Sequence, residues 1–182
     1  MPGRQLIMTF PVTATSHSLA EYRARGGYVA LEKTLKQMKP QDVTKEVTAS
    51  GLQGRGGAAF SMGRKWQVIV PDDGQPHYLC ANADEGEPGT FKDRWILENS
   101  PHQLIESMLI AAWAIQATRG YIFLRGEYVL AAQRLQHALA AGQHLLSLVD
   151  AVLDLTALGG GELTIAPEPV AQGAADLATG AD

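Results

Sequence analysis

The chain has 182 residues, of which 46% are hydrophobic, and a formal net charge of −4. This length suits one α/β domain, and this hydrophobic content excludes a mostly disordered protein. The single cysteine, Cys80, excludes an internal disulfide and a multi-cysteine metal or iron–sulfur site within these residues, and indicates a reducing compartment.

Charge is unevenly distributed along the chain. No Lys or Arg follows Arg134, and removing the six acidic residues beyond it leaves thirteen acids against fifteen bases. This mild positive charge suits a small anionic ligand better than nucleic acid. No apolar run approaches the ~18 residues of a membrane-spanning helix. Residues 1–18 resemble a loose arm more than a signal peptide.

The first part of the chain is predicted to be helical. Residues 19–40 read as a helix, a break at Gly26–Gly27 and a second helix that stops at Pro40. Residues 41–51 form a shorter helix, with Gly51 as its C-terminal cap.

Three strands are predicted, Trp66–Val70, Tyr78–Ala83 and Tyr121–Arg125. Between the last two lies the clearest helix, with Ser100 as its N-cap, Pro101 at its first position and Gln103 completing a capping box. Gly120 is expected to end this helix, and a further helix begins near Glu127. The alternation predicts an α/β fold with a parallel or mixed sheet covered by helices.

The end of the chain differs in composition. From about residue 145 it is rich in Ala, Gly and acidic residues and lacks convincing periodicity. We therefore divide the chain into the arm, an α/β domain over residues 19–148 and an irregular tail over residues 149–182. The tail is expected to be poorly ordered from Gly159 onward.

Bare backbone dominates residues 54–60, "GRGGAAF", here called the glycine loop. Residues 54–59 satisfy G-x-G-x-x-A, but that dinucleotide fingerprint must follow a strand, whereas a helix is predicted here. A P-loop is excluded because no Gly-Lys-Ser/Thr closes the segment. Consecutive backbone N–H groups can still form an anion-binding nest.

Cations and aromatic rings accompany this backbone. Arg55, Arg64 and Lys65 can supply charge for a phosphate, and Phe60 and Trp66 can stack on a ring. The alternative is a solvated turn whose aromatic side chains enter the core. Composition alone leaves both interpretations open.

A polar segment, "DEGEPGTFKDR" (residues 84–94, the acidic loop), follows the second strand. Open α/β sheets bind ligands at such strand ends. Asn82, Asp84, Glu85 and Glu87 can accept hydrogen bonds from sugar hydroxyls or an amide, or bind a hard cation, although the spacing is not that of an EF-hand. Without further information a tight hydrophilic turn is the favoured interpretation.

Other reactive residues give no site. His102 has no metal-ligating partner at helical spacing, and Cys80 is predicted to be an inert buried thiol. Ser50 and Ser61 have no nearby His–acid pair. We predict neither a metal site nor a side-chain acid or base catalyst.

Four segments carry a family resemblance: "GLQGRGGAAFSMGRKW", "YLCANADEGEPGTFKDR", "SPHQLIESMLIAAWAI" and "RGYIFLRGEY". In order and spacing they resemble the flavin- and NADH-binding flavoprotein subunit of respiratory complex I, the bacterial NADH-quinone oxidoreductase. Diaphorase subunits of NAD-linked hydrogenases and formate dehydrogenases share these motifs. The resemblance runs from about Leu19 to Ala141 and so covers only the N-terminal part of that family.

The resemblance implies a Rossmann-like α/β fold with FMN between the two loops. The residues that would hold the flavin and its phosphate are Gly54, Arg55, Gly56, Gly57 and Lys65. Those that would face its ring and ribityl hydroxyls are Asn82, Asp84 and Glu85. Phe60 would stack on NADH, and Glu87 would bind the nicotinamide end.

The resemblance also implies an activity and partners. The family is an NADH:quinone oxidoreductase in which FMN accepts hydride from NADH and passes electrons singly to an iron–sulfur cluster. Its partners would be the ferredoxin-like two-iron subunit and the large iron–sulfur subunit of the peripheral arm. The chain would be cytoplasmic and peripheral to the inner membrane, without nucleic acid and without a membrane span of its own.

The chain departs from the family pattern in several places. Ala59 stands where the family usually has Gly, Ser61-Met62 replaces Pro-Thr or Ser-Thr, and Val68 replaces an aromatic residue. Beyond about Ala141 the family's Gly-Glu-Glu segment, its Asn-rich phosphate loop and its cluster cysteines do not occur. The rival hypothesis is therefore a truncated or frameshifted, non-catalytic fragment that cannot hold FMN.

Overall fold

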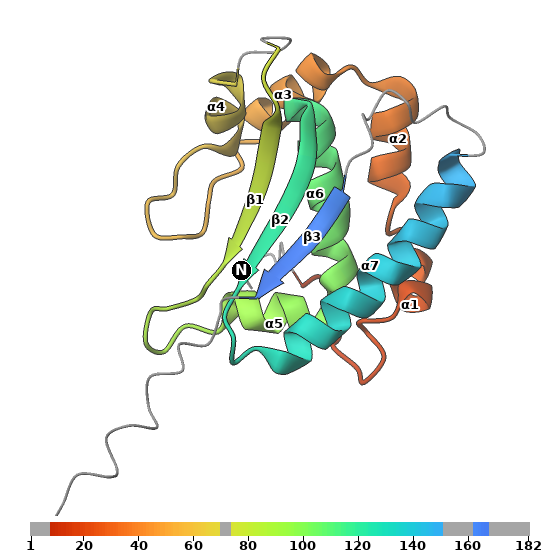
Figure 1. The fold of residues 1–182 in the computed structure, drawn as a ribbon, viewed down its shortest axis with the longest axis vertical. Coiled ribbons are helices and arrows are strands. Elements are labelled where there is room, and N and C mark those ends of the chain that lie inside the picture. Colours follow the sequence, from red (N-terminus) through yellow and green to blue (C-terminus); the bar gives the residue numbers. More distant parts are fainter. Residues whose placement is uncertain (1–7, 70–73, 151–161, 168–182) are drawn as a thin grey trace, which may run out of the picture.

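Parallel strands and helices alternate along the computed structural model, which describes residues 8–69, 74–150 and 162–167. The helices are α1 (Leu19–Ala24), α2 (Val29–Gln37), α3 (Pro40–Ala49), α4 (Met62–Gln67), α5 (Lys92–Asn99), α6 (Pro101–Ile115) and α7 (Val129–Asp150). The strands are β1 (His77–Ala83), β2 (Ala117–Leu124) and β3 (Glu162–Pro167), as Figure 1 shows.

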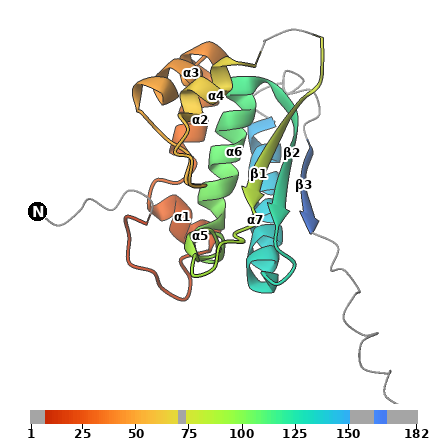
Figure 2. The ribbon, with the colours of Figure 1, turned by 90° about the vertical axis from the view of Figure 1, so that its left-hand side faces the viewer.

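The sheet has the order β1-β2-β3, and both pairings are parallel. Parallel neighbours need crossover connections, which here contain α5 and α6 between the first two strands and α7 before the third. Figure 2 shows α6 and α7 against one face of the sheet, whereas no described element covers the other face. The predicted α/β fold with a parallel sheet is confirmed.

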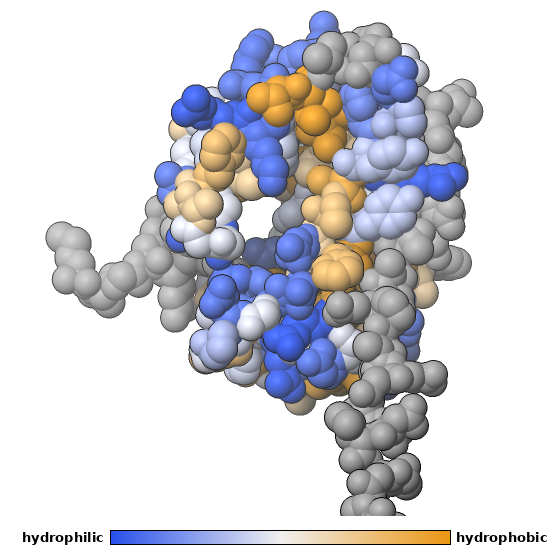
Figure 3. All heavy atoms as spheres, turned by 60° about the vertical axis from the view of Figure 1, so that its left-hand side comes forward, coloured by the Kyte–Doolittle hydropathy of each residue, from blue (hydrophilic) through white to orange (hydrophobic). Residues whose placement is uncertain are grey.

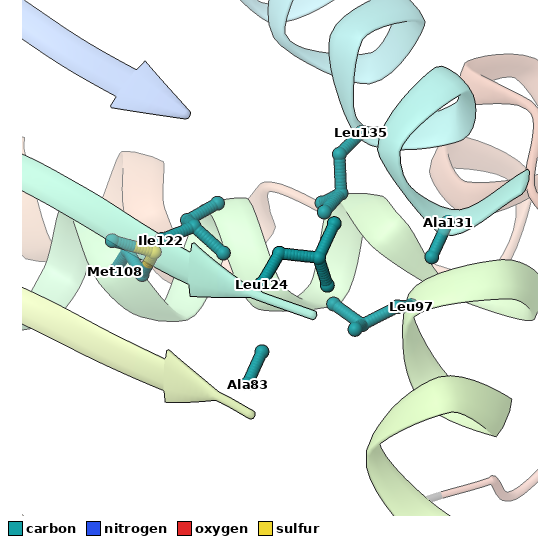
Figure 4. Close-up of a cluster of buried hydrophobic side chains, with 7 residues drawn as sticks. All are labelled: Ala83, Leu97, Met108, Ile122, Leu124, Ala131 and Leu135. Carbon is teal, nitrogen blue, oxygen red and sulfur yellow. The ribbon is translucent and has the colours of Figure 1, made fainter. Parts of the chain in front are cut away.

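The core lies between the sheet and these helices. Ile122 and Leu124 of β2 meet Leu97 of α5, Met108 of α6 and Leu135 of α7 (Figure 4). Side chains alternate between the two faces of a strand, so these buried residues are separated by exposed ones. Burial of such apolar side chains, each worth about 1.5–3 kcal/mol, holds the helices on the sheet.

The uncovered face of the sheet carries the alternate residues of β1 and β2. Tyr78 is 55% exposed, Cys80 is exposed, and Phe123 of β2 is also exposed. The prediction that Cys80 is a buried thiol is therefore wrong. The apolar run around it suggested a strand buried on both faces, but only one face of β1 is covered.

The predicted strand Trp66–Val70 is also wrong, because a helix, α4, occupies part of it and extends N-terminally from it. The Ser61 hydroxyl caps this helix by accepting a hydrogen bond from the Arg64 N–H at 3.4 Å. A Cβ at Gly63 would lie 2.5 Å from the Cα of Thr48, so α4 packs directly on α3. A short apolar run does not by itself distinguish a strand from a helix.

The predicted boundaries before α4 hold in part. The break at Gly26–Gly27 separates α1 from α2 as expected. Pro40 begins α3 instead of following a helix that ends there. Gly51 has a φ of +68°, the left-handed conformation that follows a helix end, which confirms its capping role.

At α6 the predicted start is confirmed and the predicted end is wrong. Pro101 is the first residue, but the Ser100 hydroxyl donates to Gln103 Oε1 at 3.2 Å instead of accepting a backbone N–H, so no capping box forms. The helix ends at Ile115 because Gln116 turns left-handed, with a φ of 52°. Strand β2 then begins four residues before the predicted start.

Two elements were not predicted. Helix α5 begins within the acidic loop and takes its last three residues, and β3 lies inside the predicted tail. The rest of the tail beyond α7, including Gly159, and residues 1–7 of the arm lie outside the described residues. Among the described helices none has the length and apolarity needed to cross a membrane.

Candidate functional site

The glycine loop and the acidic loop project from the same side of the molecule. Figure 1 shows both beyond the edge strand β1, and Figure 2 shows the same side from the front. The acidic loop leaves the carboxyl end of β1. In Figure 3 the surface is hollowed between the glycine loop and the sheet, with hydrophilic residues below the hollow. Open α/β sheets bind ligands at this end of their strands.

Main-chain pairing closes the glycine loop at its base. The Gly54 N–H donates to the Phe60 carbonyl at 2.9 Å, and the Met62 N–H donates to the Leu52 carbonyl at 2.9 Å. Between these bonds, the backbone N–H groups of the tip pair with no carbonyl of the described segments. A tethered loop with a bare tip can present several N–H groups to one ligand.

The tip has room for a ligand close to its backbone. A Cβ built at Gly56 or Gly57 would meet no atom within 4 Å. Gly57 has a φ of +95°, which glycine adopts without steric cost. Ala59 also has a positive φ, 49°, so this position too favours glycine.

Three cations stand at or beside this loop. Arg55, Arg64 and Lys65 are exposed. Within the described part of the chain none of their side chains forms an ion pair or a hydrogen bond. Phe60 is 56% exposed beside them. The alternative in which the loop's aromatic side chains join the core therefore does not hold at Phe60, and the charges remain available to an anion.

In the acidic loop, Glu85 faces inward. Its side chain is only 2% exposed, and its carboxylate accepts the Asp93 N–H at 3.1 Å and the Arg94 N–H at 3.3 Å. It thereby caps the N-terminus of α5. Burial alone would raise the pKa of Glu85, but these N–H groups and the Lys92 ammonium at 3.6 Å hold it below its usual value.

Arg125 ties the acidic loop to the residues after β2. Its Nη1 donates to the Glu85 carbonyl at 2.8 Å, and its Nε lies 3.6 Å from the Asp84 carboxylate. Its Nη2 donates to the Glu127 carboxylate at 3.0 Å. Sequence reasoning missed Arg125, although its place at the end of a predicted strand was a usable signal.

The remaining predicted acceptors point outward. Asn82 is exposed, and its Oδ1 accepts the Asp84 N–H at 3.0 Å, which shapes the exit from β1. The Glu87 carbonyl accepts the Thr90 N–H at 3.1 Å. The exposed Glu87 carboxylate forms no ion pair or hydrogen bond with any residue that the structure describes.

The structure thus brings most of the predicted site residues to one side of the molecule. The exception is the Glu85 carboxylate, which is directed at α5 and not at the hollow. This arrangement was not foreseen because α5 itself was not predicted. Within the described ranges no cluster of His, Cys, Asp and Glu has the makings of a metal site.

A second polar cluster lies away from the loops, on α6. The buried Glu106 carboxylate accepts the hydroxyl of Tyr22 at 2.5 Å, the Tyr28 N–H at 2.8 Å and the Leu31 N–H at 3.0 Å. His102 Nδ1 lies 2.8 Å from the Tyr28 hydroxyl. Burial, with a smaller effect of His17, lowers the pKa of His102 to about 4. This cluster holds the start of α2 on α6.

Comparison with known proteins gives concordant matches. Residues 47–160 match the family described as the Nuo51 FMN-binding domain. An F-type subunit of the NADH-quinone oxidoreductase of Rhizobium meliloti is 52% identical over 124 residues, which are 68% of this chain and 30% of that protein. The F-type subunit of the Escherichia coli enzyme is 50% identical over 123 residues, or 67% of this chain and 28% of that protein.

The fold has a solved counterpart as well. A chain of the NAD+-reducing [NiFe]-hydrogenase in the air-oxidized state is 35% identical, with a TM-score of 0.58, over 71% of this chain and 20% of that one. The chain spans about 30% of the length of the curated relatives it matches. More than half of its residues fall within one family match, in agreement with the resemblance noted from its motifs. The chain belongs to the Nuo51 FMN-binding domain family.

Proposed function

We propose that this chain supplies the glycine-loop and acidic-loop side of an FMN and NADH site in the flavoprotein subunit of an NADH-quinone oxidoreductase. The observation that carries the proposal is the shared hollow between the two loops, seen in Figure 3. A bare loop tip and exposed cations border this hollow on one side, and exposed polar residues border it on the other. Membership of an FMN-binding family supports the same assignment.

The residues present fit a flavin mononucleotide. Open space over Gly56 and Gly57 allows close approach of a flat ring or a phosphate. Arg55 and Lys65 would hold the phosphate, together with the N–H groups of the loop from Gly54 onward. Asn82 and Asp84 would accept hydrogen bonds from ribityl hydroxyls. For Glu85 we propose an indirect part, because its carboxylate is already engaged by α5.

For NADH we propose contacts with Phe60 and Glu87. Phe60 is exposed and can stack on a ring. The exposed Glu87 carboxylate, which has no partner among the described residues, can accept a hydrogen bond from the nicotinamide amide. Bound FMN supplies the hydride-accepting and one-electron chemistry, and the protein contributes position and charge. We propose no side-chain acid or base.

The assembly is proposed from the relatives. Their names make them subunits of NADH-quinone oxidoreductases. By extension, the partners would be the two-iron and the large iron–sulfur subunits of a peripheral arm on the cytoplasmic side of the membrane. The iron–sulfur cluster that accepts electrons would lie outside these 182 residues.

The test is a titration of the purified 182-residue chain with FMN, followed by the quenching of flavin fluorescence. We expect saturable binding that weakens about tenfold in Lys65→Ala and in Arg55→Ala, because each loses a charge-assisted contact. Arg23→Ala is the matched control, since Arg23 is an exposed arginine on α1, away from both loops. Equal affinity in all four proteins would show that the site is misplaced.

The same titration separates the proposal from the rival fragment. A non-catalytic fragment that lacks too much of the pocket would show no saturation with FMN at micromolar concentrations. Addition of NADH to an FMN-loaded chain, with ferricyanide as electron acceptor, then tests the oxidoreductase activity. Loss of NADH dependence in Glu87→Gln, with FMN retention unchanged, is the expected mark of the nicotinamide contact.

A second candidate function is the diaphorase role in an NAD-linked hydrogenase. It is favoured by the structural likeness to a chain of the NAD+-reducing [NiFe]-hydrogenase. Both functions use the same proposed FMN and NADH site and differ only in the final electron acceptor. Identification of the proteins that co-purify with the chain distinguishes the two.

A further inference from the structure

The inference concerns Arg125, a residue outside both loops. Leu124, the last residue of β2, pairs with Ala83, the last residue of β1. Arg125 therefore leaves the sheet beside the point where the acidic loop begins. Its guanidinium is positioned to act on that loop across the end of the sheet.

Each arm of this guanidinium has a different partner. Nη1 binds the Glu85 carbonyl, Nε faces the Asp84 carboxylate and Nη2 binds the Glu127 carboxylate. Two of these partners lie in the acidic loop, and the third follows β2. A planar guanidinium can satisfy several acceptors at fixed angles, whereas a lysine ammonium acts as a flexible point charge.

The far end of the loop is held by other contacts. The Glu85 carboxylate binds the Asp93 and Arg94 N–H groups, and the Tyr128 hydroxyl lies 3.5 Å from it. Glu85 is thus fixed through its main chain by Arg125 and through its side chain by α5. The segment between these two attachments contains Glu87, whose carboxylate is unpaired among the described residues.

We propose that Arg125 is a positioning residue that fixes the acidic loop at the end of the sheet and thereby sets the affinity for the nucleotide. It acts through the Glu85 main chain and the Asp84 carboxylate and does not touch the ligand. This inference rests on the proposed function for its ligand, but not for the ordering of the loop.

The experiment compares the 182-residue chain with Arg125→Ala, Arg125→Lys and Arg94→Ala. Arg94 is the matched control because its exposed side chain pairs with Glu98 on its own helix and lies near the same Tyr128 ring. Hydrogen exchange of the Asp93 amide reports the Glu85 attachment without any ligand. FMN affinity and the circular dichroism of bound flavin at saturation report the site.

In Arg125→Ala we expect about tenfold faster exchange of the Asp93 amide and about tenfold weaker FMN binding, since a charged hydrogen-bond donor is lost. The dichroism of the bound flavin should also change, which a purely global loss of stability would not cause. Arg125→Lys should lie between the wild type and Arg125→Ala, because the ammonium keeps the charge but not the fork. Arg94→Ala should match the wild type.

Two results would overturn the inference. One is an unchanged Asp93 exchange rate in Arg125→Ala, and the other is unchanged FMN affinity and dichroism in that variant. If the wild-type chain binds no FMN, the proposed function fails, and the Asp93 exchange rate alone still decides whether Arg125 orders the loop. The failures of the two proposals are therefore distinguishable.

Discussion

The helical side of the molecule and its loop side use charged groups in opposite ways. On the helical side, the Glu106 carboxylate is buried and accepts three hydrogen bonds at the start of α2. On the loop side, Arg55, Lys65 and Glu87 are exposed, and no ion pair or hydrogen bond engages their side chains in the described segments. The first arrangement serves stability, and the second leaves charges available to a ligand.

Glu85 shows that position in a motif does not decide which of these uses a residue has. It belongs to the acidic loop, yet its carboxylate caps α5 much as Glu106 caps α2. By its contacts it groups with the helical side. The variants below test this division, because groups of the first kind should affect unfolding and groups of the second kind should not.

The largest effect is expected at Glu106. Glu106→Ala should lower the free energy of unfolding by about 4 kcal/mol, because it leaves two backbone N–H groups and a buried hydroxyl without their acceptor. Urea unfolding monitored by tryptophan fluorescence measures this change. Glu32→Ala, which removes only an exposed pair with Lys36, should change it by less than about 0.5 kcal/mol. A loss at Glu106 no larger than this control would contradict the comparison.

Acid should weaken the same cluster through His102. Its pKa is about 4 in the folded chain and 6.5 as an ordinary value, so the unfolded chain binds the proton more readily. Stability should be complete above pH 6.5 and fall by about 2–3 kcal/mol as the pH drops to 4, with part of the shift screened by solvent. His102→Gln should remove this part of the pH dependence of unfolding. The exposed His137 offers a control, since His137→Gln should leave the slope unchanged.

A smaller loss is expected at Glu85. Glu85→Gln should lower the free energy of unfolding by about 2 kcal/mol, because the amide keeps one acceptor oxygen but loses the charge that caps α5. Thermal unfolding of the two chains gives the difference. Glu87→Gln is the matched control and should unfold like the wild type. If both variants unfolded alike, Glu85 would have to be regrouped with the ligand-facing residues.

The smallest effect is expected in the glycine loop, and it has the opposite sign. Ala59→Gly should raise the free energy of unfolding by about 0.5 kcal/mol, because Ala59 has a φ of 49° that glycine adopts without strain. Ala58→Gly is the control, since Ala58 has no positive φ and should lose stability instead. Chemical denaturation of the three chains shows whether the two signs differ as expected.

The parallel sheet and the two loops could be predicted from the sequence for a physical reason. Strand β1 and helix α6 have strong local patterns, and glycine-rich or acidic segments announce their own chemistry. The strand predicted at Trp66–Val70 failed because a helix cap at Ser61 and the contact of Gly63 with α3 decide that segment. Neither contact is visible in hydrophobic periodicity.

The site was predicted less completely than the fold. Exposure at Phe60 and the open space over the loop glycines agree with a ligand loop, but the residue that organises the acidic loop was overlooked. Arg125 is 40 positions from Glu85 in sequence, and their contact depends on the pairing of β1 with β2. Only a three-dimensional arrangement reveals a contact of that kind.

Gly63 gives the loop side a fixed dimension. Its missing side chain lets α4 rest on the backbone of Thr48, at a spacing that any larger residue would have to widen. Arg64 and Lys65 are the next two residues of the same helix, so they are carried wherever α4 rests. The distance between these two charges and the rest of the protein is therefore set by the width of a single absent methyl group.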